Sequence, residues 1–481
     1  IKLLTQKLKI QRFFMSKEGT LAKNTIIYAI GNFGSKILSF ILVPFYTYYL
    51  STNDYGYFDL ITTTVSLLVP IITFQIYDGL YRYLLDSKSD TESANIISNS
   101  FFITIRNLTI FSVGYLIFVQ FKNFRYEYLI LLQIDFSILS GLWAQIARGL
   151  RRNVEYSVSG ILSTVVILGS NILFITVMNL RVGSLIISNV LSAVVMIIYL
   201  NRQLKIHKYI RFKLNSKIIK KKLIIFSIPL IPTVISWWFM NVSDRYFLAF
   251  YKGVEANGIY AISNKFPAIL VMLNTIFTLA WQESAITEYD SKDRNKFYTK
   301  MFNVLMSLEF TAVIGLLAFT KFVMHFMVNA KFESAWMFVP FLYMGTIFNS
   351  FSSFYGTGYL SSKDTIGAFY TSVIGGIFNI IINIALIPII GIQGASFSTM
   401  IAFLVMWLTR LWQTRKYFRI DIDLKRLIIL SIISVLFIFT YYSNNKIIEI
   451  MMMILSVIIF VMFNRSLISK AVKFAKNKVR K

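Results

Sequence analysis

The sequence has no cysteine and only two histidines, His207 and His325, among its 481 residues. Without cysteine it can form no disulfide, no thiolate metal site and no thiol nucleophile. Two isolated histidines do not suggest a metal centre or an acid–base cluster. The sequence also contains no phosphate-binding loop, no Gly-rich dinucleotide motif, no HExxH and no nucleophile elbow. We therefore expect neither an enzyme nor an ATPase, and we expect no cofactor or metal.

Charged residues are scarce as well. They make up 15% of the chain, against 56% hydrophobic residues, and the mean hydropathy is +0.64. Repeated apolar runs of 18 or more residues predict transmembrane helices. The fold class expected is therefore an all-α polytopic membrane protein with about fourteen such helices. Their predicted ranges are 22–50, 57–84, 95–119, 127–148, 156–178, 183–201, 222–250, 257–283, 298–320, 335–359, 366–387, 392–413, 426–442 and 447–463.

The net charge of +27 would suggest a nucleic-acid partner in a soluble protein. In a membrane protein the positive-inside rule explains it better, because lysines and arginines collect in cytoplasmic loops. With the N-terminus inside, most of them fall in cytoplasmic segments: Lys205–Lys222, Lys292–Lys300, Arg410–Arg426 and the tail from Arg465. We therefore expect a multi-pass membrane protein, with both termini cytoplasmic and no nucleic-acid partner.

An internal repeat organises the chain. The turn LSTNDYGYF around Gly56 resembles the turn KGVEANGIY around Gly258, at a spacing of 202 residues. Chance similarity between glycine-containing turns is the alternative. The repeat predicts two pseudo-symmetric six-helix bundles with a substrate site between them, as in transporters built from parallel repeats. The expected organisation is an amphipathic N-terminal segment 1–21, an N-terminal lobe 22–204, a basic linker 205–221, a C-terminal lobe 222–417, an extra helix pair 418–464 and a basic tail 465–481.

A few charges lie inside the apolar runs, where an unpaired ion costs roughly 3 kcal/mol or more. The polar and charged candidates are Asn32, Lys36, Asp78, Arg82, Arg106, Asp135, Asp244, Arg245, Lys265 and Glu309. Spacing and depth predict three ion pairs: Asp78 with Arg82, Arg106 with Asp135, and Asp244 with Lys265. Such pairs could simply fix how the helices align with one another.

The cations Lys36, Arg245 and Lys265 outnumber the single carboxylate at their depth, Asp244. A surplus of cations in a cavity suits an anion, most naturally a phosphate. Glu309 is either a neutral acid in the core or a proton or sodium site.

Arg148, Arg151 and Arg152 form a basic cluster at the predicted inner end of the fourth helix. The cluster is either an anchor that sets the topology or a landing site for lipid headgroups.

Several motifs together resemble those of the Wzx-type polysaccharide-biosynthesis flippases, which belong to the multidrug/oligosaccharidyl-lipid/polysaccharide exporter superfamily. They are NTIIYAIGNFGSKILSFILVP (24–44), YLSTNDYG (49–56), Asp244-Arg245, NGIY (257–260) and SNK (263–265). The resemblance implies two lobes, with helices one, two, seven and eight lining a cationic cavity. It also implies that Lys36 and Lys265 are cavity cations, with Arg245 beside them.

The function implied is flipping of an undecaprenyl-diphosphate-linked oligosaccharide from the inner to the outer leaflet by alternating access, for surface polysaccharide such as capsule or exopolysaccharide. Arg82 and Arg106 are further candidate cavity cations, and Asn32, Asp78 and Asp135 are candidate polar cavity residues. Asp244 and Glu309 are candidates for coupling to H⁺ or Na⁺. The expected partners are membrane lipids, a glycan polymerase and glycosyltransferases.

Three alternatives remain open. A peptidoglycan-precursor flippase would use the extra helix pair as a lipid groove. A drug/cation antiporter of the same superfamily would favour carboxylates in the first helix, which here carries Lys36. A membrane-embedded glycan polymerase would need longer outer loops than this sequence predicts.

Overall fold

A computed structural model describes residues 40–122, 125–362, 365–443 and 445–479. These residues form helices and connecting loops, and no strand occurs among them. Eleven of the described helices are long and apolar enough to cross a membrane. The predicted all-helical membrane fold is therefore confirmed. The chain divides into two compact units, one with the described residues up to Leu50 and residues Tyr57–Ile235, the other with Ser51–Gly56 and Ser236 onward.

The first unit is built on a buried apolar cluster that includes Ile97, Leu142 and Leu223. Within it α8 packs against α9, and α7 packs against α5 and α9. The helices of this part of the chain are α3 (Val43–Tyr49), α4 (Thr52–Ile72), α5 (Ile76–Asp86), α6 (Asp90–Phe121), α7 (Glu127–Gly149), α8 (Asn153–Thr176), α9 (Val182–Leu204), the short 3₁₀ turns η1 (Ile206–Lys208) and η2 (Phe212–Leu214), α10 (Lys217–Ser227), η3 (Ile228–Leu230) and α11 (Ile231–Val242).

The predicted helix 57–84 is two helices, which corrects that prediction. Phe74 and Gln75 have φ values of 53° and 52°, and such left-handed residues end α4. The Gln75 N–H bonds to the Pro70 carbonyl at 2.9 Å, five residues back, which closes the helix with a wide turn. The Gln75 side chain then donates to Asp78 at 3.0 Å in the first turn of α5. These local contacts stabilise the interruption between α4 and α5. The hydropathy of the sequence does not predict it, because the residues on both sides are apolar.

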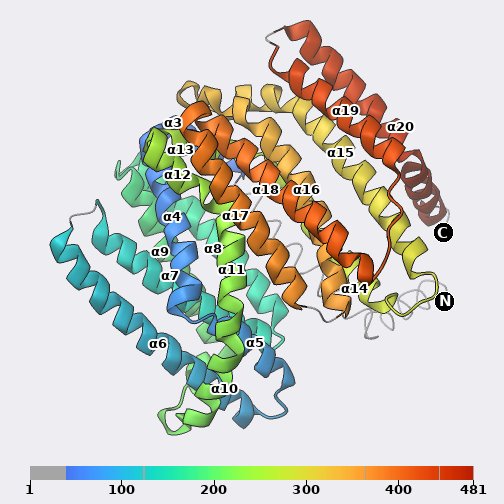
Figure 1. Ribbon diagram of the computed structural model, residues 1–481. Helices are drawn as coiled ribbons and strands as arrows, with labels where there is room; N and C mark the ends of the chain where they lie inside the picture. The colour runs from blue at the N-terminus through green and yellow to red at the C-terminus, as the bar shows by residue number, and fades with distance from the viewer. Residues whose placement is uncertain (1–39, 123–124, 363–364, 444, 480–481) are drawn as a thin grey trace. The chain divides into compact units, whose positions relative to one another are not determined.

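The second unit contains α12 (Asp244–Lys252), α13 (Val254–Ser263), α14 (Pro267–Thr287), α15 (Arg294–Met327), η4 (Ala330–Phe338), α16 (Val339–Ser362), α17 (Thr365–Ile390), α18 (Ile392–Gln413), η5 (Thr414–Lys416), α19 (Leu424–Tyr441) and α20 (Lys446–Val479). Within it α16, α17 and α18 pack together, and α19 and α20 lie along α15 (Figure 1).

Three predicted helices of this region are also interrupted. The run 222–250 divides into α10, η3, α11 and α12, with Pro229 and Pro232 near the first breaks. The run 257–283 divides at Asn264–Phe266, and Pro267 begins α14, a position where its missing N–H costs nothing. The run 335–359 begins as the 3₁₀ helix η4. Hydropathy alone does not locate such breaks.

The C-terminal helix pair is fixed to α15 by polar contacts at both ends. The Lys321 ammonium donates to the Ser443 carbonyl at 2.7 Å and lies 3.5 Å from the Glu449 carboxylate. Asn464, whose backbone is non-helical inside α20, donates to the Thr311 hydroxyl at 2.9 Å. The pair is therefore packed against α15 along much of its length.

The two glycines of the repeat meet inside the second unit. A Cβ added to Gly56 would lie 2.7 Å from the Gly258 nitrogen, and one added to Gly258 would lie 2.8 Å from the Thr52 carbonyl carbon. Real Cβ atoms do not approach other atoms so closely. The Asn257 amide donates to the Gly56 carbonyl at 2.9 Å beside this crossing. Only glycine lets the starts of α4 and α13 cross at this distance.

Candidate functional site

The fully buried Asp244 carboxylate is the centre of a polar cluster in the second unit. Ser243 separates α11 from α12, so Asp244 stands at the first position of α12. Its Oδ1 accepts from Asn383 Nδ2 at 2.6 Å, and its Oδ2 accepts from the Tyr260 hydroxyl at 2.8 Å. The Thr399 hydroxyl also donates to Oδ2. Three donors, from α17, α13 and α18, therefore converge on one carboxylate.

Two buried asparagines extend the cluster along α17. Asn383 Nδ2 also donates to Asn379 Oδ1 at 3.0 Å, and the Ser243 hydroxyl donates to the same oxygen at 2.9 Å. Asn383 Oδ1 is buried and has no hydrogen-bond partner among the described residues. An acceptor left unsatisfied in a buried site is costly. The cluster thus presents carboxylate, amide and hydroxyl oxygens in one place, with one oxygen available for a further partner.

The predicted Asp244–Lys265 salt bridge is wrong. The carboxylate takes neutral hydroxyl and amide donors, while Lys265 lies half-buried between α13 and α14. The prediction rested on similar depth in neighbouring helices. Depth does not determine the rotation of each helix about its axis, so the two side chains need not face each other. The Asp244 charge is therefore balanced by hydrogen bonds, with no cation bonded to it in the described part of the chain.

Arg245 lies next to this cluster and is half-buried. Its Nη1 donates to the Asn241 carbonyl at 3.1 Å, and its guanidinium carbon lies 5.9 Å from the centre of the Tyr260 ring. Tyr260 therefore contacts Asp244 through its hydroxyl and Arg245 through its ring. Lys36 and Asn32, the first-helix members of the predicted site, lie outside the described residues.

The predicted pair Asp78–Arg82 is replaced by another. Arg82 Nη1 bonds to Asp86 Oδ1 at 2.7 Å, and both side chains are more than half exposed. Asp78 accepts from Gln75 instead. Arg82 points toward the Asp86 end of α5, so the i,i+4 contact forms on its C-terminal side.

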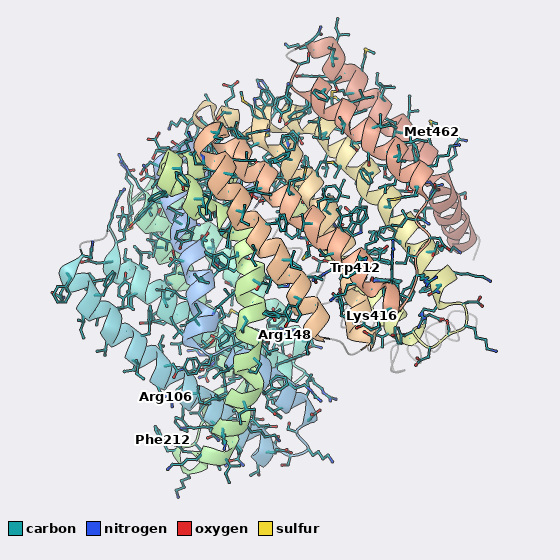
Figure 2. All side chains as sticks on the ribbon, in the orientation of Figure 1. Arg106, Arg148, Phe212, Trp412, Lys416 and Met462 are labelled. Atoms are coloured by element: carbon teal, nitrogen blue, oxygen red, sulfur yellow. The ribbon has the colours of Figure 1, made fainter. Side chains whose placement is uncertain are left out.

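The predicted pair Arg106–Asp135 is also wrong. Arg106 is exposed on α6, on the part of that helix nearer to α10 (Figure 2), and its guanidinium bonds to Asn107 Oδ1 at 2.9 Å. Asp135 accepts from the Ser112 hydroxyl at 3.0 Å. Arg106 lies on α6 and Asp135 on α7, as expected, but each side chain bonds to a polar residue of α6 and not to the other.

The basic cluster at the end of α7 is held by aromatic rings and backbone. The Arg148 guanidinium lies 4.8 Å from the Tyr81 ring centre and 5.7 Å from that of Tyr156. Arg151 has a left-handed backbone, with φ of 59°, and donates to the Leu85 carbonyl at 3.2 Å. Arg152 lies 3.9 Å from Glu155. The three arginines therefore do not point to a common position.

Glu309 is buried in α15, where its Oε1 accepts from the Ser350 hydroxyl at 2.8 Å. No lysine or arginine forms an ion pair with it in the part of the chain that the structure describes. The hydrogen-bond donor to Glu309 comes from α16, whereas the donors to Asp244 come from α13, α17 and α18.

The sequence did not single out Asn379, Asn383, Thr399 or the buried Arg410. The signal for the asparagines was two amides four residues apart in the apolar run 366–387, on one helix face. Arg410 lies in the last turn of α18, where it donates to the Thr371 hydroxyl at 3.1 Å, the Ser352 carbonyl at 2.8 Å and the Ser372 hydroxyl at 3.0 Å. The sequence predicted that Arg410 belongs to a cytoplasmic basic segment. In the structure its hydrogen bonds link α18 to α16 and α17.

The helix arrangement is similar to that of membrane proteins whose structures have been solved. The structure is similar to that of the lipid II flippase MurJ in an inward closed conformation, with a TM-score of 0.68 and 17% identity over 92% of this chain and 100% of that one. It is also similar to an inward-facing multidrug resistance MATE transporter, with a TM-score of 0.65 and 10% identity over 79% of this chain and 95% of that one.

The sequence comparisons identify the family. The model of the polysaccharide biosynthesis protein family matches residues 21–282, more than half of the chain. The chain therefore belongs to that family. It is also 23% identical to the uncharacterized membrane protein MJ1068 of Methanocaldococcus jannaschii, over 84% of this chain and 85% of that protein.

Proposed function

We propose that this protein is a flippase that moves undecaprenyl-diphosphate-linked oligosaccharide units from the inner to the outer leaflet of the bacterial cell membrane for surface polysaccharide biosynthesis. The observation that carries the proposal is membership of the polysaccharide biosynthesis family over residues 21–282. The fold shared with a lipid II flippase supports a lipid-linked substrate. In this proposal both termini are cytoplasmic, and a glycan polymerase and glycosyltransferases are the functional partners.

The diphosphate would be held by Lys36, Arg245 and Lys265. Arg245 supports this role because its guanidinium is half-buried beside Tyr260, where a planar cation can bond two phosphate oxygens at once. Lys265 lies half-buried between α13 and α14, in the same unit as Arg245. Arg148, Arg151 and Arg152 would meet lipid headgroups at the inner surface.

Transport would be coupled to H⁺ or Na⁺ at Asp244. Oxygen atoms of a carboxylate, an amide and a hydroxyl suit a hard cation, and Asn383 Oδ1 has no partner among the described residues. A bound cation or proton would neutralise a buried carboxylate that is otherwise costly in a membrane. Tyr260 contacts both Asp244 and Arg245. Binding of a cation or proton at Asp244 would therefore alter phosphate binding at Arg245.

Deletion of the gene, followed by analysis of membrane lipids, tests the proposal. A flippase of this kind leaves a lipid-linked repeat unit on the inner leaflet when it is lost. Complementation with Lys265→Glu should fail while the protein remains folded. Lys331→Glu, an equal charge change at an exposed position of η4, should restore export.

The alternatives give different results. Accumulation of the peptidoglycan precursor would identify a lipid II flippase, a candidate supported by the similarity to MurJ. Unchanged lipid intermediates together with increased drug sensitivity would identify an antiporter. Full export by both the Lys265→Glu and Lys36→Glu variants would refute the cationic diphosphate site without refuting the flippase.

A further inference from the structure

The first unit contains an open pocket between α5 and α10. Its volume is about 670 Å³, a size typical of small-ligand sites. Among the described residues, no carboxylate lines it. Its walls are formed by Tyr83, Ile218, Lys221, Lys222, Ile225 and Phe226.

The two helices that form this pocket, α5 and α10, are closely packed against each other. A Cβ added to Gly79 of α5 would lie 2.5 Å from the Ser227 hydroxyl oxygen of α10 and 3.4 Å from the Leu223 carbonyl, so the two helices meet at short range. Tyr83 and Phe226 stand edge to face with ring centres 5.6 Å apart. The pocket is therefore shaped by helix packing and does not depend on a loop.

The two lysines give the pocket a net positive charge. Lys222 Nζ lies 4.6 Å from the centre of the Tyr83 ring, and both Lys221 and Lys222 are exposed. Neither forms an ion pair within the described part of the chain, and the Asp86 carboxylate next along α5 is bonded to Arg82. From residue 202 to 222 the sequence has nine lysines and arginines and no carboxylate. The local chemistry therefore favours an anionic ligand.

The position of the pocket along its helix indicates what kind of anion. Residues Lys217–Val242 form one of the candidate membrane spans, and the lysines occupy its first two turns. Ile225 and Phe226 follow about one turn later and are 62% and 37% exposed. With this span across a bilayer, the lysine ammoniums would lie at the headgroups and the apolar side chains at the start of the acyl region.

We infer that this pocket binds the phosphate headgroup of an anionic phospholipid, with Lys221 and Lys222 on the phosphate and Ile225 and Phe226 against the start of the acyl chains. A soluble anion would leave the apolar half of the pocket without a contact. The inference does not depend on what the protein transports, because a lipid bound here belongs to the surrounding membrane.

Native mass spectrometry of the purified, delipidated full chain tests the site. In titrations, the first phosphatidylglycerol molecule should bind with higher affinity than the first phosphatidylcholine molecule. Each lysine near an anionic headgroup is worth about fivefold in binding, so Lys221→Gln/Lys222→Gln should weaken phosphatidylglycerol binding by at least tenfold. The control Lys205→Gln/Lys208→Gln removes the same charge from a different pocket, one that Asp90 also lines, and should leave the first site unchanged.

Three results would overturn the inference. An equal loss of phosphatidylglycerol affinity in both double variants would show that the lipid is attracted by the charge of the whole basic linker and not by this pocket. No preference for phosphatidylglycerol over phosphatidylcholine would show that the lysines do not bind headgroups. Tighter binding of undecaprenyl phosphate than of phosphatidylglycerol, lost in Lys221→Gln/Lys222→Gln, would assign the pocket to a polyprenyl lipid. None of these readouts requires the protein to flip a substrate.

Discussion

Replacing Gly258 by alanine should destabilise the second unit by forcing apart the helix starts that cross at Gly56. The added Cβ would lie 2.8 Å from the Thr52 carbonyl carbon and nearer still to its oxygen, whereas ordinary contact begins at 3.4 Å. The two backbones must therefore separate by more than 0.6 Å. Thr52 cannot yield by rotating a side chain, because the atoms in the way belong to the backbone.

The expected cost has two parts. Overpacking of a close contact costs roughly 1–3 kcal/mol. Separation also stretches the buried bond from the Asn257 amide to the Gly56 carbonyl, now 2.9 Å long, and a lost bond of this kind costs about 1 kcal/mol or more. Alanine gains about 1 kcal/mol in helix propensity, which offsets part of the loss. The net effect is a destabilisation of about 1–3 kcal/mol, visible as a Tm lower by a few degrees.

Thermal unfolding of the purified protein in detergent measures this effect. Gly160→Ala is the matched control, because Gly160 lies inside helix α8 and an added Cβ there meets nothing within 4 Å. Its Tm should be unchanged or slightly higher. Gly56→Ala should resemble Gly258→Ala.

The double variant Gly56→Ala/Gly258→Ala should cost less than the sum of the two single changes, because one methyl group already parts the helices. Equal Tm values for Gly258→Ala and Gly160→Ala would refute the close crossing. Fully additive losses would show that the two glycines act at separate contacts.

Three further predictions concern the polar contacts of the second unit. Asp244→Asn should leave the fold intact but abolish any dependence of flipping on a Na⁺ or H⁺ gradient in proteoliposomes; retention of that dependence would exclude Asp244 as the coupling site. Arg410→Met should lower the Tm because it leaves Thr371 and the Ser352 carbonyl without their buried donor, at about 1–3 kcal/mol each, whereas a Tm equal to that of the parent would mean that water replaces the guanidinium. Lys321→Met should loosen the α19–α20 pair and speed its proteolysis, and Lys331→Met, on an exposed side chain, is the control that should not.

The membrane helices that lie between well-separated turns could be predicted closely. The range 127–148 became α7 (Glu127–Gly149), and 183–201 became α9 (Val182–Leu204). Each is a long apolar run between polar residues, which is the signal hydropathy detects. The breaks at residues 73–75 and 264–266 could not be located, because they depend on a few backbone angles and hydrogen bonds inside otherwise apolar stretches.

The candidate site could be predicted only in part, for a geometric reason. Counting residues from a turn gives the depth of a side chain, and depth correctly singled out Asp244 as a buried charge. It says nothing about the rotation of each helix or about which distant helix lies opposite. Asn383 is 139 residues away in the sequence, and only the packing of α12 against α17 brings it to the carboxylate.

Under the predicted internal repeat, some residues of the two copies match and others do not. At the spacing of 202 residues, Gly258 corresponds to Gly56, and the two still form one reciprocal contact. At the same spacing Asp244 corresponds to Leu42, which is 5% exposed, and Lys265 corresponds to Thr63. A glycine crossing depends on both copies, since each backbone fills the space left by the other, whereas a buried carboxylate needs donors from its own unit and costs free energy without them. The close crossing therefore uses both glycines of the predicted repeat, whereas the buried Asp244 carboxylate corresponds to an apolar residue, Leu42.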